Sequence, residues 1–80
     1  LKGWEFGNDK IKKEFSFKDF SEALAFIVRI GLEADKQGHH PGIANVYNTV
    51  NIELSTHDAA DKVTQKDVDL ATAIESVSHI

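Results

Sequence analysis

Residues 19–42 read DFSEALAFIVRIGLEADKQGHHPG, and this stretch predicts one long helix that ends in a stiff loop. Asp19 and Glu22 have the spacing of a capping box, in which Asp19 accepts hydrogen bonds from first-turn amides and Glu22 reaches back. Gly38 is a natural helix stop, and Pro41 forbids the helix from continuing. The apolar residues predicted to face the core follow at helical spacing: Phe20, Leu24, Ile27, Gly31 and Ala34.

Two strands are predicted before this helix. Residues 4–6 read as a short strand, and residues 7–10 as a turn, because Gly and Asn tolerate positive φ. Over residues 11–17, apolar and polar side chains alternate with the period of two that suits a half-buried strand. Lys13 is the exception on the inward side of this pattern, so we expect it near the edge of the sheet.

After the helix, two more strands and a second helix are predicted. Residues 43–48 and 50–55 read as strands, and residues 58–63 as a loop. Thr64 caps the last helix, with Asp67 at its third position. The buried side of this helix is expected to comprise Val68, Ala71, Ile74 and Val77 or Ser78. The order β-β-α-β-β-α favours an α+β fold, an antiparallel sheet with helices packed on one face.

Length and composition limit the functional classes. A chain of 80 residues is expected to form a single domain, residues 1–80, with a thin core that oligomerisation would supplement. The net charge of -4 argues against direct nucleic-acid binding and against a basic membrane-binding surface. No apolar run approaches the roughly 20 residues that cross a bilayer, and no signal-peptide pattern opens the chain. We expect a cytoplasmic protein.

The residue types at hand exclude several chemistries and favour one. Without cysteine there is no disulfide, no Cys-based zinc site and no thiol nucleophile. Without methionine the chain lacks an initiator, which suggests a trimmed N-terminus. The remaining signal is histidine: Gly38-His39-His40-Pro41-Gly42 follows the first helix, and His57 follows the last strand. Because an unperturbed imidazole titrates near neutrality, these side chains suit proton transfer.

The ordered set of chemically informative residues is Asp35, His39, His40, Pro41, Tyr47, His57 and Asp67. This long, gapped pattern resembles the signature of the pterin-4a-carbinolamine dehydratases, whose animal members also act as dimerisation cofactors of a homeodomain transcription factor. The likeness extends over nearly the whole chain, through Gly3-Trp4, residues 15–20, residues 45–48 and residues 54–57. It implies a four-stranded antiparallel sheet with helices on one face, and a further N-terminal helix that this chain largely lacks.

The resemblance also implies a reaction. It is the dehydration of 4a-hydroxytetrahydrobiopterin to quinonoid dihydropterin, a step in tetrahydrobiopterin recycling that involves only proton movement. His39 and His57 would be the acid and the base, with exchangeable roles, and His40 would bind and orient the pterin. The remaining residues expected to bind substrate are Asp35, Pro41, Asn45, Tyr47, Ser55, Thr56 and Asp67. The pterin is the substrate, so no cofactor and no metal are expected.

Each of these residues also has a structural reading. His39 and His40 could be a solvated pair at a helix end, where positive charge suits the helix dipole. Asp67 could serve only as a helix cap, or its carboxylate could orient His57 or another site histidine and favour its protonated form. Tyr47, in a strand, could be half-buried packing. A zinc site is disfavoured, because adjacent histidines do not easily converge on one ion.

Two departures from the family keep other functions open. The family often carries an aromatic residue two positions after the proline, where this chain has Ile43, and Gly38 replaces an acidic residue sometimes found before the first histidine. A homologue that serves a different pterin is therefore one alternative. Another is a non-catalytic oligomeric binding module that stabilises a transcription-factor dimer. Phe26 and Ile30 widen the apolar stripe of the first helix, which suits helix-to-helix assembly into a homodimer or homotetramer.

Overall fold

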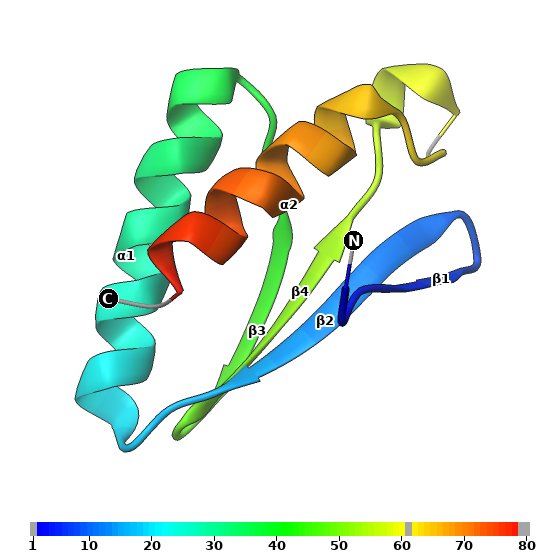
Figure 1. Cartoon of the computed structure of the whole chain (residues 1–80). Coiled ribbons are helices and arrows are strands. Elements are labelled where there is room, and N and C mark those ends of the chain that lie inside the picture. The colour runs from blue at the N-terminus through cyan, green and yellow to red at the C-terminus, as the bar shows by residue number, and fades with distance from the viewer. Residues whose placement is uncertain (1, 61, 79–80) are drawn as a thin grey trace.

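A computed structural model describes residues 2–60 and 62–78 of the chain (Figure 1). The elements in chain order are β1 (Glu5–Gly7), β2 (Lys10–Ser16), α1 (Phe20–Gln37), β3 (Gly42–Val46), β4 (Thr49–Leu54), the short 3-10 helix η1 (His57–Ala59) and α2 (Gln65–Val77). The four strands form one antiparallel sheet in the order β1-β2-β4-β3. The predicted α+β class with a four-stranded antiparallel sheet is confirmed. Within the predicted loop 58–63, residue 61 lies outside the described part of the chain.

One face of the sheet carries the core. Its inward side chains come from the two central strands and pair across them, Ile11 with Leu54 and Phe15 with Val50. Both helices pack on this face, and the buried cluster joins β2, β4, α1 and α2. Within the described ranges 2–60 and 62–78, no helix covers the opposite face (Figure 1), and its charged side chains such as Lys12 are exposed. The alternation read from the sequence therefore places one side of each central strand against the helices.

Lys13 lies near an edge of the sheet, as expected: β1 pairs only with Lys10 to Lys12, so Lys13 is paired with β4 alone. Its Nζ lies 2.5 Å from Oε2 of Glu75, on α2, and 4.8 Å from the centre of the Phe15 ring. Trp4 Nε1 donates a hydrogen bond to the same carboxylate oxygen at 2.9 Å. A half-buried lysine is tolerated on the inner face because its charge is paired there.

The buried stripe of α1 is not the predicted one. The residues that face the core are Ala23, Phe26, Ile30 and Ala34. Phe26 stacks between Phe15 and Phe17, with ring centres 4.9 Å from each. Of the predicted stripe only Ala34 is fully buried, and Ile27 is partly buried. A second stripe faces outward instead: Phe20, Leu24, Val28 and Leu32, which are 44 to 63% exposed. The helix carries two apolar stripes. The one that packs on the sheet contains Phe26 and Ile30, which were predicted to serve helix-to-helix assembly instead.

The helix ends follow the predicted chemistry with one change. Asp19 Oδ1 accepts from the Glu22 amide at 3.0 Å, but Glu22 reaches back to the amide of Lys18 instead of that of Asp19. Gly38 ends α1 in the left-handed conformation, with φ of 63°. The next amide, that of His39, donates to the Ala34 carbonyl at 3.1 Å, so the last turn of α1 fixes where the histidine loop starts.

In α2 the predicted buried residues Ala71 and Ile74 are confirmed, whereas Leu70 and Asp67 are buried where Val68 was expected. The two hairpins turn at residues with positive φ, Asn8 and Asp9 in the first and Tyr47 in the second. Tyr47 therefore lies in a turn, not in the strand that was predicted over residues 43–48. Among the described residues, no helix is long and apolar enough to cross a membrane.

Candidate active site

Three chain segments that are distant in sequence end at one hollow of about 260 Å³. The end of α1 contributes the first segment, the end of β4 the second, and the first turn of α2 the third. The lining residues are Gly38, His39, His40, Ser55, Thr56, His57 and Lys66. The structure thus brings the three predicted imidazoles together within a single chain, along with Ser55 and Thr56.

His39 is held by a buried carboxylate. Its Nε2 lies 2.5 Å from Oδ1 of Asp67, whose side chain is fully buried, and the His39 side chain is only 11% exposed. Because an ionised carboxylate only accepts hydrogen bonds, Nε2 carries the hydrogen and Nδ1 is the ring nitrogen left for other partners. The histidine that Asp67 contacts is His39, one of the options that the sequence left open, and not His57.

A small polar network surrounds Asp67. Its Oδ2 accepts from the Thr56 hydroxyl and from the Thr64 amide, each at 2.8 Å. The hydroxyl groups of Thr56 and Thr64 lie 2.5 Å apart. Burial alone would raise the pKa of the Asp67 carboxyl, but the hydrogen bonds from His39, Thr64 and Thr56 outweigh burial and lower that pKa below its ordinary value of 3.8. The carboxylate is therefore ionised at neutral pH.

The other two histidines are more open to solvent. His40 is exposed, and its Nε2 lies 3.4 Å from Oδ1 of Asp35, a contact at the limit of a hydrogen bond. His57 is exposed at the first position of η1, directly after the end of β4. The hollow thus has one imidazole, that of His39, fixed by the buried Asp67 carboxylate, and two exposed imidazoles, those of His40 and His57. Such an arrangement suits proton transfer to and from a bound ligand.

Five of the predicted substrate-binding residues do not line this hollow: Asp67, which is buried and contacts His39, and Asp35, Pro41, Asn45 and Tyr47. Asp35 is reached only through His40, and Pro41 connects the histidine loop to β3. Asn45 donates to the backbone carbonyls of Tyr47 and Thr49, at 3.2 and 2.8 Å, and so supports the β3–β4 turn. Tyr47 is 63% exposed in that turn. Five residues of extended strand span about 17 Å, so this turn lies at the far end of β3 from the histidines.

Ile43, the residue that departs from the family, also lies outside the hollow. It belongs to β3, is 39% exposed and lines a separate depression on β3 and β4. Conversely, Lys66 lines the hollow from the first turn of α2 and was not among the predicted site residues. A single lysine at a helix start gives no distinguishing signal in the sequence, because lysines are mostly solvated.

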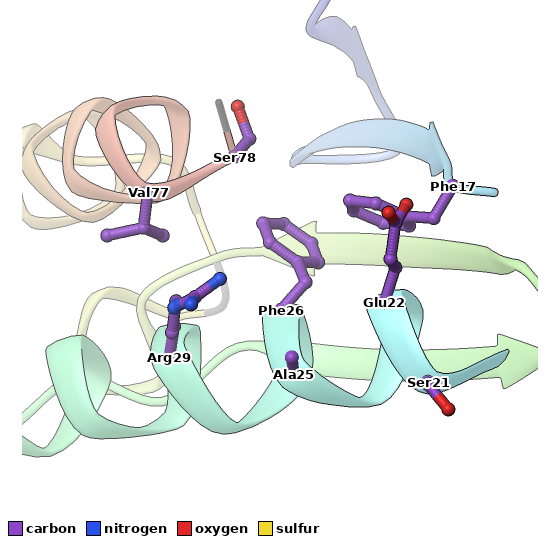
Figure 2. Close-up of a pocket in the computed structure, with 8 residues that line it drawn as sticks. All are labelled: Phe17, Ser21, Glu22, Ala25, Phe26, Arg29, Val77 and Ser78. Atoms are coloured by element: carbon purple, nitrogen blue, oxygen red, sulfur yellow. The ribbon is translucent and has the colours of Figure 1, made fainter. Parts of the chain in front are cut away.

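A second hollow lies elsewhere in the fold (Figure 2). It has a volume of about 240 Å³ and is lined by Phe17, Ser21, Glu22, Ala25, Phe26, Arg29, Val77 and Ser78. Phe26 and Arg29 project from α1 toward the end of α2. No histidine is among its lining residues. Across residues 2–60 and 62–78, no group of three or more His, Asp or Glu side chains is placed to hold a metal ion.

The comparisons with known proteins agree with this geometry. The sequence model of the pterin 4 alpha carbinolamine dehydratase family matches residues 1–77. A relative from Opitutus terrae, named "Putative pterin-4-alpha-carbinolamine dehydratase", is 48% identical over 80 residues, which are 100% of this chain and 82% of the relative. A relative of the same name from a Bradyrhizobium strain is 48% identical over 98% of this chain and 80% of its own length.

Solved structures give the same answer for the fold. The crystal structure of a transcriptional coactivator/pterin dehydratase from Brucella melitensis has a TM-score of 0.91 and 36% identity, and covers 98% of this chain and 84% of that one. A pterin dehydratase-like protein described as a RuBisCO assembly factor of the alpha-carboxysome has a TM-score of 0.80 at 20% identity, over 95% of this chain and 89% of that one, and shows the fold alone. The chain belongs to the pterin-4a-carbinolamine dehydratase family.

Proposed function

We propose that this protein dehydrates 4a-hydroxytetrahydrobiopterin to quinonoid dihydropterin and water, in the recycling of tetrahydrobiopterin. The observation that carries the proposal is the meeting of His39, His40 and His57 at one hollow, with His39 held by a buried, ionised Asp67. Membership of the family supports the substrate class. The reaction needs no cofactor, because the pterin itself is the molecule that changes.

The proposed chemistry is a pair of proton transfers. One imidazole donates a proton to the 4a-hydroxyl group as the bond from C4a to that oxygen breaks, and the oxygen leaves as water. A second imidazole takes the proton from N5, whose electron pair forms the new double bond to C4a. Protons and electrons balance without an oxidant or a reductant. Imidazoles suit both roles because their ordinary pKa lies near the working pH.

We assign these two roles to His39 and His57, and to His40 the orientation of the ring. Asp67 acts through His39: it accepts the Nε2 hydrogen at 2.5 Å and so leaves Nδ1 to exchange protons. Ser55 and Thr56 line the same hollow at the end of β4. We assign to their backbone the contact with the edge of the flat heterocycle. Ser55 has the larger part in this assignment, because the Thr56 amide already donates to the Lys62 carbonyl and the Thr56 hydroxyl to Asp67.

The direct test is an assay with freshly generated 4a-hydroxytetrahydropterin, in which loss of substrate is followed above its spontaneous dehydration. The expected result is a rate proportional to protein concentration. No acceleration by well-folded wild-type protein would refute the proposal. Replacement of each histidine then separates acid–base catalysis from binding, as the Discussion sets out.

A second candidate function, an oligomeric binding module, is favoured by the outward stripe of α1. Phe20, Leu24, Val28 and Leu32 are 44 to 63% exposed on one helix face, and an exposed apolar stripe of this kind is typical of an association surface. We propose that this face joins copies of the chain into a homodimer or homotetramer, with a transcription-factor partner as the alternative occupant. The oligomeric state measured in solution tests this assignment.

A further inference from the structure

One positively charged side chain that lines the histidine hollow, that of Lys66, has no role in the proposed dehydration. Lys66 is exposed on the first turn of α2 and lines the hollow beside Thr56 and His57. No ion pair joins Lys66 to another residue within 2–60 or 62–78. Neither the departing hydroxyl group nor N5 of a pterin carries a negative charge that a lysine would bind.

The charge of the hollow is unlike that of the whole chain. The protein has a net charge of -4, yet the seven residues that line the hollow include three histidines, one lysine and no Asp or Glu. Two described carboxylates lie close by. Asp67 is buried and bonded to His39, Thr56 and Thr64, and Asp35 faces His40 at 3.4 Å. Among the seven lining residues, Lys66 is therefore the one that carries a permanent charge.

A second depression continues from the α2 side of the hollow. It has a volume of about 340 Å³ and is lined by Thr56, Ala59, Thr64, Gln65 and Lys66. Thr56 and Lys66 line both hollows, so the two are contiguous over the start of α2. At the start of α2 the Thr64 amide already donates to Asp67 Oδ2, and the Asp67 amide to the Thr64 carbonyl, so an anion there would be bound by the Lys66 ammonium group. A ring-sized ligand in the histidine hollow could thus extend a substituent across Lys66 into the second depression.

We infer that Lys66 forms a subsite for an anionic side chain of the pterin, namely a phosphate group carried on the substituent of the ring. This inference rests on the proposed function for the position of the ring, and it names the substrate class. The phosphate would face the Lys66 ammonium group, while the ring meets the three imidazoles. A pterin with a neutral side chain would occupy the histidine hollow alone.

The test compares two ligands that differ by one phosphate group, 7,8-dihydroneopterin and its 3′-monophosphate. Their binding is measured by calorimetric titration of the full chain at low salt. We expect the phosphate ester to bind about five- to tenfold more tightly, the range of a partly exposed charge-assisted contact. The preference should shrink in high salt, because exposed charges are screened. Inorganic phosphate should compete with the ester and leave the neutral pterin unaffected.

Three variants locate the effect. Lys66→Gln should abolish the preference, and Lys66→Arg should keep it, since the charge is retained. Lys12→Gln makes the same change in net charge on the exposed face of β2 and should leave the preference intact. Equal binding of both pterins by wild type, or an unchanged preference in Lys66→Gln, would overturn the inference.

The failure of this inference and of the proposed function are distinguishable. If the neutral pterin binds and 4a-hydroxytetrahydropterin is dehydrated, but the ester has no advantage, the dehydratase stands and the anion subsite falls. If the ester binds through Lys66 but no pterin is dehydrated, the subsite stands and the enzyme assignment falls. If neither pterin binds to folded protein, both are wrong.

Discussion

His39 Nε2 lies 2.5 Å from Oδ1 of Asp67, and this contact joins the loop after α1 to the first turn of α2. The carboxylate is fully buried and completes its hydrogen bonds with Thr56 and the Thr64 amide. One buried charge therefore ties the ends of three elements together. The stability of the fold and the orientation of a candidate catalytic ring depend on the same atom pair.

This contact predicts a pH-dependent contribution to stability. The pKa of Asp67 is lowered in the folded state from its ordinary value of 3.8, so the ionised group stabilises the fold above that value. The contribution is lost as the pH falls through the folded pKa. At neutral pH, Asp67→Asn should lower the free energy of unfolding by about 2–3 kcal/mol, because donors aimed at a carboxylate lose their charged acceptor. Urea unfolding followed by Trp4 fluorescence measures it.

The matched control for Asp67→Asn is Asp69→Asn, since Asp69 is exposed on the same helix. It should change the free energy of unfolding by less than about 0.5 kcal/mol. The difference between wild type and Asp67→Asn should also narrow as the pH falls below 3.8, the ordinary pKa of the group, toward the lowered pKa of the folded state. A difference that stays constant across this pH range would show that the charge of Asp67 contributes nothing.

Replacement of the histidines separates their roles. His39→Ala and His57→Ala should each lower kcat for 4a-hydroxytetrahydropterin by about 100-fold or more, the usual contribution of a general acid or base. His40→Ala should mainly raise KM, since this ring is proposed to orient the pterin. Circular dichroism of each variant checks the fold. If His39→Ala and His57→Ala both turn over substrate at the wild-type rate, the acid–base assignment is wrong.

Thr56 is predicted to act through Asp67. Thr56→Val removes one of the donors to Asp67 Oδ2 and should destabilise the fold by about 1–3 kcal/mol. It should also alter the pH profile of kcat, because the carboxylate that orients His39 is less well held. Thr56→Ser keeps the hydroxyl group and should restore both properties. A Val variant that is destabilised but keeps the wild-type pH profile would confine Thr56 to a structural role.

Substitution by alanine should change the stability in opposite directions at two glycines, Gly31 within α1 and Gly38 directly after it. Gly38 has φ of 63°, so Gly38→Ala should destabilise the protein by about 1 kcal/mol even though an added Cβ meets no atom within 4 Å. Gly31 is helical and also has free space, so Gly31→Ala should stabilise by about 0.5–1 kcal/mol. Thermal unfolding of both variants checks the pair. Equal effects would mean that the left-handed residue does not limit the end of α1.

The outward stripe of α1 predicts a change in assembly. Leu24→Glu places a charge in the middle of this stripe and should shift the protein toward monomer in size-exclusion chromatography with light scattering. Thr72→Glu adds the same charge to an exposed position on α2 and serves as the control. A wild-type protein that is monomeric at high concentration would refute the proposed oligomer.

The sequence predicted the order of elements and the fold class, because strand periodicity and helix caps are local properties. It did not predict which stripe of α1 is buried. Leu24 and Phe26 are both apolar and lie about 160° apart on a helix of 3.6 residues per turn, so either could face the sheet. The choice depends on contacts of Phe26 with Phe15 and Phe17, which the spacing of apolar residues within the helix does not reveal.

The site was predictable only in part, for a similar reason. The three histidines were recognisable by type and spacing, and the structure brings them to one hollow. Tyr47 was placed in a strand because its type favours strands, but a two-residue connection between β3 and β4 puts it in the turn. Lys66 was missed, because a lone lysine in a helix is usually solvated, and only the packing of α2 against β4 reveals what it faces.

The C-terminal end of α1, where Gly38 is left-handed, couples opening of the last helical turn to loss of the contact between His39 and Asp67. The His39 amide closes the last turn through the Ala34 carbonyl, so opening that turn carries the His39 ring away from Asp67. Hydrogen–deuterium exchange at this single amide therefore reports how often the contact between His39 and Asp67 is formed. A ligand that fills the hollow should slow this exchange well before it changes the melting temperature of the whole domain.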